Sequence, residues 1–278
     1  LIQCFNKYRS IFFMGENGLI AVIGDVHGCV NTLDLLYGKI SKKTEAVFSV
    51  GDLVDRGKFS KQTVGFCLEK NIKCVCGNHE DILLRALENP DERYNRTGFS
   101  NFEVAMSLGG KATVYSYLKH IKTGIPSSFN IDSFDRELFT DFRKNYPLFI
   151  DEMRTSGHLD FIKSFPLRYE FHGTVITHAG IVLSENASEP RRIDSSGNLN
   201  LNGVDDYSLM WNRDIPSDIG KFQIYGHTPV LSPDFLEYKY IDIDTGCVYG
   251  NRLTSVIVNP LTGTVLEVVS VPCDSRDR

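Results

Sequence analysis

Four short motifs carry side chains that can bind metal ions, and they follow one another along the chain. They are residues 24–28 (GDVHG), 51–57 (GDLVDRG), 77–80 (GNHE) and 226–228 (GHT), and residues 177–180 (THAG) add a further histidine. Together they supply carboxylate, imidazole and amide groups, which are common ligands of divalent metal ions. Two such ions, about 3.5–4 Å apart, can activate water and hold phosphoryl oxygens. The motifs therefore indicate hydrolysis of a phosphoryl ester.

Six side chains from these motifs are candidate ligands for two adjacent ions. Asp25 and His27 stand on one tight turn and can bind the first ion, and Asp52 is placed to bridge both. The second site is completed by three neutral side chains, which are Asn78, His178 and His227. Neutral ligands keep the total negative charge low, so the ions stay acidic enough to activate water. A single motif of this kind arises by chance, but all of them in order favour a metal site.

Each motif follows a short run of β-branched and aromatic residues that predicts a buried strand. These runs are residues 19–23, 46–50, 72–76, 174–177 and 222–225. Apolar residues at helical spacing predict helices over 30–40 and 60–70, so the chain opens as β-α-β-α-β. This order predicts a mostly parallel sheet covered by helices. Ligands placed just past the strand ends would converge on one edge of that sheet.

The remaining segments predict one domain over 15–278 with an insertion at about 81–173. The insertion has helical spacing at 82–87 and 148–163, and it could either set specificity or serve as structural filler. Residues 240–244, 253–258 and 265–271 alternate with turns and predict an antiparallel sheet packed against the first layer. Residues 1–14 lack the long apolar run and the cleavage site of a signal peptide, so we expect a loosely ordered extension.

Composition excludes several classes of function. The net charge of −5 in 278 residues argues against binding nucleic acid through gross positive charge. The apolar runs have strand length, far below the roughly 20 residues of a membrane helix. The seven cysteines are an odd number without a C-x-x-C pair. Cys74 and Cys76 alternate along a predicted strand as small buried side chains, and we expect a reducing, cytoplasmic location.

The sequence resembles the metallophosphoesterase superfamily, in particular its phosphoprotein phosphatase branch. The signatures of that branch, GDxHG, GDxVDRG and GNHE, are present without a substitution. The HAG and GHT pieces are similar to bacterial and phage members, as are residues 243–247 (IDTGC) with Leu253 and Thr254 behind them. The similarity covers about residues 19–258 and is weakest across the insertion. It implies an α/β fold, a two-layered β-sheet sandwich flanked by helices of the calcineurin-like kind, with a mainly helical insertion.

The resemblance also implies a role for each site residue. It gives the same six metal ligands, and it makes His79 the general acid that protonates the leaving alkoxide, held and polarised by Asp55. The substrate-binding residues that it implies are Arg56, Asn78 and, in residues 209–214 (LMWNRD), Arg213. It implies two divalent ions, with manganese expected and iron or zinc as alternatives.

Other polar residues near the motifs have simpler explanations. Asp244 is expected to support a turn or a ligand rather than to bind metal. Glu80 opens a predicted helix, where a carboxylate is favourable in any case. Three histidines lie outside every motif and are expected to be structural or solvated: His120, His158 and His172.

Our leading hypothesis from the sequence is a phosphatase for phosphoserine and phosphothreonine in proteins. A water or hydroxide activated by the two ions would attack phosphorus in line, without a phosphoenzyme. The alternative is a hydrolase of a nucleotide phosphoanhydride, such as a bis(5′-nucleosyl)-tetraphosphate. The Asp55–Arg56 pair and Glu80 favour the first. A nuclease is disfavoured because Thr228 and Pro229 leave no second histidine after His227, and a non-catalytic binding module is disfavoured because every ligand is present.

Overall fold

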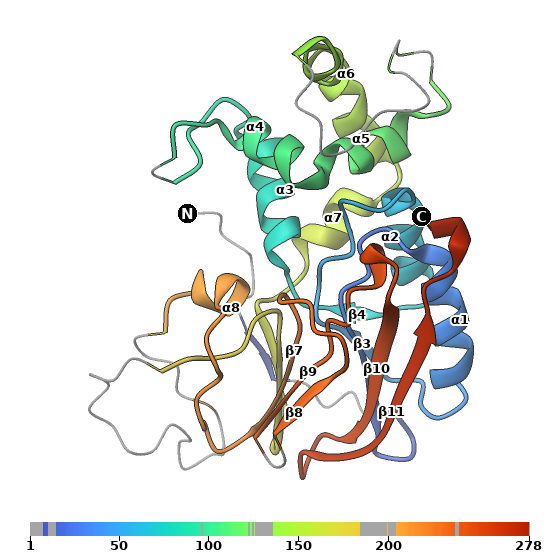
Figure 1. Ribbon diagram of the computed structural model, residues 1–278, viewed down its shortest axis with the longest axis vertical. Helices are drawn as coiled ribbons and strands as arrows, with labels where there is room; N and C mark the ends of the chain where they lie inside the picture. Colours follow the sequence, from blue (N-terminus) through green and yellow to red (C-terminus); the bar gives the residue numbers. More distant parts are fainter. Residues whose placement is uncertain are drawn as a thin grey trace.

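Two β-sheets form the body of the protein in the computed structural model (Figure 1). The structure describes residues 8–10, 15–95, 97–121, 123, 125, 136–183, 199, 204–236 and 239–277. The first sheet has the order β11-β10-β2-β3-β4. Its strands are β2 (Ile20–Ile23), β3 (Val47–Ser49), β4 (Lys73–Cys74), β10 (Arg252–Asn259) and β11 (Thr264–Pro272). The first three are parallel, as predicted, whereas β10 is antiparallel to both β2 and β11.

The second sheet has the order β1-β5-β6-β7-β9-β8. Its strands are β1 (Tyr8–Ser10), β5 (Arg168–Glu170), β6 (Thr174–Thr177), β7 (Phe222–Tyr225), β8 (Asp234–Leu236) and β9 (Tyr240–Asp242). Strands β6, β7 and β9 are parallel to one another. Strand β1, which lies within the predicted N-terminal extension, pairs with β5 in parallel. Residues 1–7 and 11–14 of the extension lie outside the described residues.

The two sheets pack on each other through alternate side chains of their strands. In β2, Ile20 and Val22 join a cluster shared with Ile176 and Ile224 of the second sheet. Ala21 and Ile23 of the same strand point to the opposite face and join the core beneath the helices. Because side chains alternate along a strand and both faces are covered, the run is apolar throughout.

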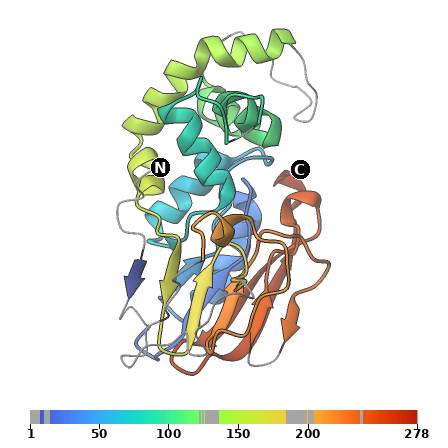
Figure 2. The ribbon, with the colours of Figure 1, turned by 90° about the vertical axis from the view of Figure 1, so that its left-hand side faces the viewer.

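Helices cover the first sheet and stand over one end of both sheets. Helices α1 (Val30–Ile40) and α2 (Ser60–Glu69) belong to the layer against the first sheet. The helices above the sheets are α3 (Asn78–Glu88), α4 (Asn101–Ala105), α5 (Lys111–Leu118), α6 (Arg136–Thr155) and α7 (His158–Lys163), as Figures 1 and 2 show. A short helix, α8 (Ser208–Trp211), lies beside the second sheet. No helix among the described residues is long and apolar enough to cross a membrane.

The predicted fold class is confirmed, but two details of the arrangement were wrong. The C-terminal strands do not form a sheet of their own, because β10 and β11 extend the first sheet and β9 joins the second. The predicted helix over 148–163 is two helices, since Gly157, with φ of 74°, separates α6 from α7. The interval that begins at residue 81 ends with β5, so its last residues belong to the sandwich rather than to a helical insertion.

Helix α1 is capped by a residue from the other end of the chain. Its N-terminal residue has no side-chain cap of its own. Instead Asp277 Oδ1 accepts from the backbone N–H of Asn31 (3.2 Å), and Asp277 Oδ2 accepts from that of Thr32 (2.8 Å). A carboxylate at this position satisfies free backbone donors and complements the helix dipole. The cap therefore ties the C-terminal segment to the helix that follows the Asp25–His27 turn.

Candidate dimetal active site

The structure brings all six predicted metal ligands together at one end of the sandwich. Asp25, Asp52 and Asn78 follow strands of the first sheet, whereas His178 and His227 follow β6 and β7 of the second. The expectation of a single sheet edge is therefore corrected: the ligands lie where the ends of two sheets meet. Asp25, Asp52 and His178 have ligand atoms within 4.8 Å of one another, as do His27, Asp52 and His79.

The backbone at the site adopts conformations that are rare for residues with a side chain. Seven non-glycine residues of the described part have positive φ, and two of them are asparagines. The other five are site residues: His27 (44°), Asp52 (51°), Asp55 (70°), Arg56 (66°) and His227 (77°). Such conformations cost roughly 1–3 kcal/mol each and collect at functional sites. These backbone conformations therefore lower the stability of the folded chain, and they orient the side chains of the site.

Two glycines of the motifs allow neighbouring loops to approach the carboxylates. A Cβ added at Gly226 would lie 2.1 Å from Asp25 Oδ1, and one at Gly77 would lie 2.2 Å from Asp52 Oδ1. Neither contact is possible for real atoms, so glycine is required at both positions. The glycines of the motifs therefore serve the geometry of the ligands.

The first group of ligands is Asp25, His27 and Asp52. The Nδ1 of His27 lies 2.7 Å from Val54 O, a carbonyl that can only accept, so Nδ1 carries the proton. Its Nε2 then carries a lone pair, and this atom lies 3.3 Å from Asp52 Oδ2. The guanidinium of Arg56 donates to the same Nε2 at 2.7 Å. A metal ion bound by His27 would therefore have to displace this Arg56 contact.

The second group of ligands places acceptor atoms against one another. His178 Nδ1 donates to Val50 O (2.8 Å), so its Nε2 carries a lone pair instead of a proton. This Nε2 lies 2.8 Å from Asn78 Oδ1, which is also an acceptor. His227 Nδ1 is 3.0 Å from the same oxygen, and Asp52 Oδ1 is 3.5 Å from His178 Nε2. His227 Nε2 is buried without a hydrogen-bond partner among the described residues. A cation among these atoms would turn repulsion into coordination, so the residues fit a metal ion.

Burial changes the pKa values of the ligands in opposite directions. Burial, with the Asp244 and Asp52 carboxylates, raises the pKa of Asp25 well above its ordinary value. Burial lowers the pKa of His27 and of His178, and it lowers the pKa of His227 to about 3. The three imidazoles are therefore neutral, which is the form that binds metal. A cation would also compensate the buried carboxylate.

His79 differs from the other histidines of the site. Burial alone would lower its pKa, but the carboxylates of Asp52 and Asp55 outweigh burial and raise it. Nδ1 of His79 donates to Asp55 Oδ2 at 2.7 Å, and its Nε2 lies 3.9 Å from Asp52 Oδ2. The hydrogen bond of Nδ1 to Asp55 thus fixes the ring so that Nε2 points toward the ligand atoms.

Thr113, which no sequence motif singles out, holds Asp55 in place. The hydroxyl of Thr113 donates to Asp55 Oδ1 (2.6 Å) and accepts from the Asp55 backbone N–H (2.8 Å). From the preceding turn, Gly109 O accepts from the Arg56 backbone N–H (3.2 Å). The segment predicted as an insertion therefore supports the Asp55–Arg56 pair, and no local signal identifies a partner 58 residues away.

Glu80 is a second residue whose part in the site was underestimated. Its side chain is fully buried, and its two oxygens accept four backbone N–H groups. Oε1 accepts from Leu53 (2.8 Å) and Val54 (3.3 Å), and Oε2 accepts from Asp52 (2.8 Å) and Gly77 (3.0 Å). Glu80 is thus more than a favourable helix start, because it joins the loop of Asp52 to the loop of Asn78. The position of Glu80 in the GNHE motif was the sequence feature that could have indicated this role.

The remaining polar residues lie at the positions expected of them. Arg213 is exposed, and its Nη1 donates to Thr228 Oγ1 (3.4 Å), which places it beside the His227 loop. Asp244 Oδ1 accepts from Gly246 N–H (3.0 Å), as expected of a residue that supports a turn. The histidines outside the motifs have other partners or face solvent. His120 lies near Glu152, His158 bonds to Tyr117 and His172 is exposed.

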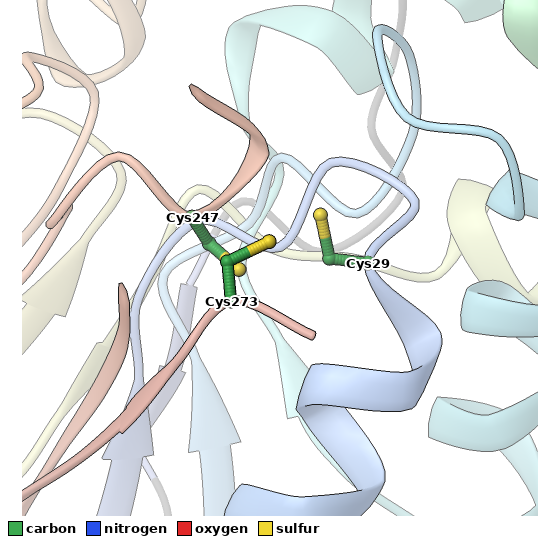
Figure 3. Close-up of side chains that lie close together, drawn as sticks. All are labelled: Cys29, Cys247 and Cys273. Carbon is green, nitrogen blue, oxygen red and sulfur yellow. The ribbon is translucent and has the colours of Figure 1, made fainter. Parts of the chain in front are cut away.

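Three buried thiols lie beneath the His27 turn. Cys29, at the start of α1, packs against Cys247 and Cys273, and their sulfur atoms lie within 4.8 Å of one another (Figure 3). The Sγ of Cys29 donates to His27 O at 3.7 Å. None of these three cysteines is in a disulfide, and neither are Cys67, Cys74 and Cys76. Cys74 and Cys76 are buried in and after β4, which confirms their predicted role as small buried side chains.

Comparison with known proteins identifies the family. The calcineurin-like phosphoesterase family matches residues 18–250, and the protein belongs to this family. An asymmetrical bis(5′-nucleosyl)-tetraphosphatase of Oceanobacillus iheyensis is 28% identical over 258 residues, 85% of this chain and 87% of the relative. A symmetrical bis(5′-nucleosyl)-tetraphosphatase of Photobacterium profundum is 26% identical over 262 residues, 84% of this chain and 92% of the relative. The resemblance to metallophosphoesterases is thereby confirmed.

A solved structure shares the fold. A crystal structure assigned provisionally to a diadenosine tetraphosphatase matches with a TM-score of 0.51 and 19% identity. The match covers 98% of this chain and 100% of that chain. This match shows that the two proteins share a fold. Membership of the calcineurin-like phosphoesterase family makes the protein a hydrolase of the dimetal phosphoesterase kind.

Proposed function

We propose that this protein hydrolyses a phosphoanhydride bond of a dinucleoside polyphosphate, of the bis(5′-nucleosyl)-tetraphosphate kind. The observation that carries the proposal is the similarity over most of both chains to relatives named as bis(5′-nucleosyl)-tetraphosphatases. The complete set of ligand residues supports a catalytic chain rather than a binding module. This reverses the order of our two hypotheses from the sequence, because the nucleotide hydrolase was the alternative there.

The residues divide the reaction among them. Asp25, His27 and Asp52 would hold one divalent ion, and Asp52, Asn78, His178 and His227 the other, with manganese as our proposed metal. When bound, the ions would supply Lewis acidity toward water and phosphoryl oxygens. His79, protonated through Asp52 and Asp55, gives its proton to the leaving oxygen. Arg56 and Arg213 offer guanidinium groups that match phosphate oxygens in a planar, two-point geometry. The amide of Asn78, between His178 and His227, is the third candidate for binding the substrate.

A protein phosphatase remains the second candidate, but the residues that favoured it do not discriminate. Glu80 is occupied by four backbone N–H groups, and Asp55 by His79 and Thr113. Both therefore build the metal site, which either substrate would need. Of the three residues that favoured the phosphatase, Arg56 is the one that faces the site, and a guanidinium binds the phosphate of a nucleotide as readily as that of a peptide.

The cysteines outside disulfides support a reducing location, and we place the protein in the cytoplasm.

The experiment that tests the proposal compares two substrates under the same conditions. Initial rates are measured on diadenosine tetraphosphate and on a phosphothreonine peptide, with added manganese and with a chelator. We expect manganese-dependent hydrolysis of the dinucleotide, with a kcat/KM at least tenfold above that for the peptide. A preference for the peptide would return the protein to the phosphatase hypothesis and leave the metal site standing.

A further inference from the structure

Tyr249 is a large aromatic residue left in solvent beside the candidate active site. It ends a short 3-10 helix, Cys247–Tyr249, in the loop that follows Asp244, and 64% of it is exposed. The tyrosine ring lies 5.7 Å from the guanidinium carbon of Arg56. An exposed aromatic ring next to a phosphate-binding candidate suits a ligand that has both a phosphate and an aromatic part.

Arg56 connects this ring directly to the metal ligands. Its Nη1 lies 2.7 Å from His27 Nε2, while its guanidinium carbon faces the Tyr249 ring. The ring is thus separated from a ligand atom by the width of one guanidinium group. A phosphate bound by Arg56, and by the ion that His27 would hold, would place the group attached to it near Tyr249. In a nucleotide, that group is a ribose with its base.

The loop of Tyr249 is held in a fixed shape by its own hydrogen bonds. Asn251 Nδ2 donates to Thr245 O (2.7 Å) and to Leu231 O (3.1 Å), and Thr245 Oγ1 donates to Arg252 O (2.9 Å). Gly246 and Gly250, with φ of 66° and 91°, allow the tight bends on either side of the ring. A ring in a fixed position loses little conformational entropy when it binds a flat ligand.

The other exposed tyrosine near the site is already occupied. Tyr207 stacks on Trp211, with ring centroids 5.4 Å apart and planes at 14°, and Trp211 contacts His227. One face of the Tyr207 ring is therefore covered. Tyr249 is 64% exposed, against 42% for Tyr207, and its ring contacts the Arg56 guanidinium rather than a stacked ring, so it offers more free ring surface.

From these contacts we infer that Tyr249 is a base-binding platform, on which a nucleobase of the substrate stacks while Arg56 binds its phosphate. The inference rests on the proposed function and names the part of the substrate that is recognised. Base–aromatic stacking changes affinity by about 5- to 160-fold when the ring is removed, and it tolerates different bases. The platform would favour nucleotides over base-free phosphates of the same charge.

The test replaces the ring and compares substrates with and without a base. In manganese-loaded enzyme, Tyr249→Leu should raise KM for diadenosine tetraphosphate about tenfold and leave kcat within threefold. KM for inorganic tripolyphosphate, which has no base, should stay within twofold. Tyr249→Trp should keep the low KM. The matched control is Phe99→Leu, which removes an aromatic ring of similar exposure, 62%, on the turn before α4, and it should change neither KM.

A binding measurement separates this inference from the proposed function. By calorimetry on the manganese-loaded enzyme, Tyr249→Leu should weaken ADP at least fivefold and leave pyrophosphate unchanged. If the wild type fails to hydrolyse the dinucleotide, the proposed function fails, and the ADP titration still decides the platform. Unchanged ADP binding would overturn the inference. An equal loss for ADP and pyrophosphate would also overturn it, because the ring would then act only by positioning Arg56.

Discussion

The sharpest prediction concerns Glu80→Gln, which keeps the shape of the side chain and removes its charge. Each oxygen of Glu80 accepts two backbone N–H groups. A glutamine has one oxygen, so in either orientation its NH2 group faces two N–H donors. Hydrogen bonds to a charged group contribute about 1.5–3 kcal/mol each, so losing two costs about 3–6 kcal/mol. Burial raises the pKa of Glu80 from 4.5 to about 7, so removing the charge returns about 3 kcal/mol, and we expect a net loss of about 1–3 kcal/mol.

Burial raises the pKa of Glu80 to about 7. The assay is therefore urea unfolding at pH 8, which is above this pKa, so that Glu80 is ionised. Glu103→Gln is the matched control, since Glu103 is also the third residue of a helix but accepts only one backbone N–H, that of Ser100. We expect the control to lose less than about 1 kcal/mol. A loss of less than 1 kcal/mol for Glu80→Gln, or equal losses for both variants, would refute the role assigned to the Glu80 carboxylate.

Three further predictions follow from the site and its surroundings. His79→Asn should lower kcat for an alkyl phosphate by about 100-fold or more. The decrease should be smaller for a phosphoanhydride, because its leaving oxygen needs less protonation. Elemental analysis should show the same metal content in the variant and the wild type. Chelation should abolish activity and lower Tm by several degrees, and manganese should restore both. Burial lowers the pKa of His158 in the folded protein below 6.5, its value in the unfolded chain. As the pH falls through 6.5, the unfolded chain therefore binds a proton that the folded protein does not, and the protein loses stability. His158→Asn should reduce this loss between pH 7.5 and 5.5, as measured by urea unfolding.

Local patterns in the sequence were sufficient for most of the elements that carry the site. Residues 30–40, 174–177 and 222–225 form α1, β6 and β7 with the predicted bounds. Each has a clear period or a β-branched run, followed by a residue that ends it. The candidate ligands could be found for the same reason, because each follows a strand within a few residues. The sequence predicted that they converge, but it placed them on one sheet edge, whereas the structure draws them from two sheets.

The pairing of distant segments could not be read from local patterns. Strand β10 was predicted as a strand, but its pairing with β2 depends on the whole topology, since Ser255 lies opposite Ile23. Thr113 is one of many threonines in a polar region, and its role depends on how α5 packs over Asp55. Tyr249 had no signal in the motifs, because its exposure and its contact with Arg56 exist only in the folded chain.

The cap that Asp277 provides for α1 has a consequence for the order of events during synthesis. Asn31 leaves the ribosome 246 residues before the carboxylate that caps its helix. At about 5–20 residues per second, the interval is roughly ten seconds or longer. Throughout it, the first helix lacks its cap and β2 lacks β10 at its side. The turn with Asp25 and His27 lies between these two elements, so both of its flanks are complete only after translation has passed residue 277.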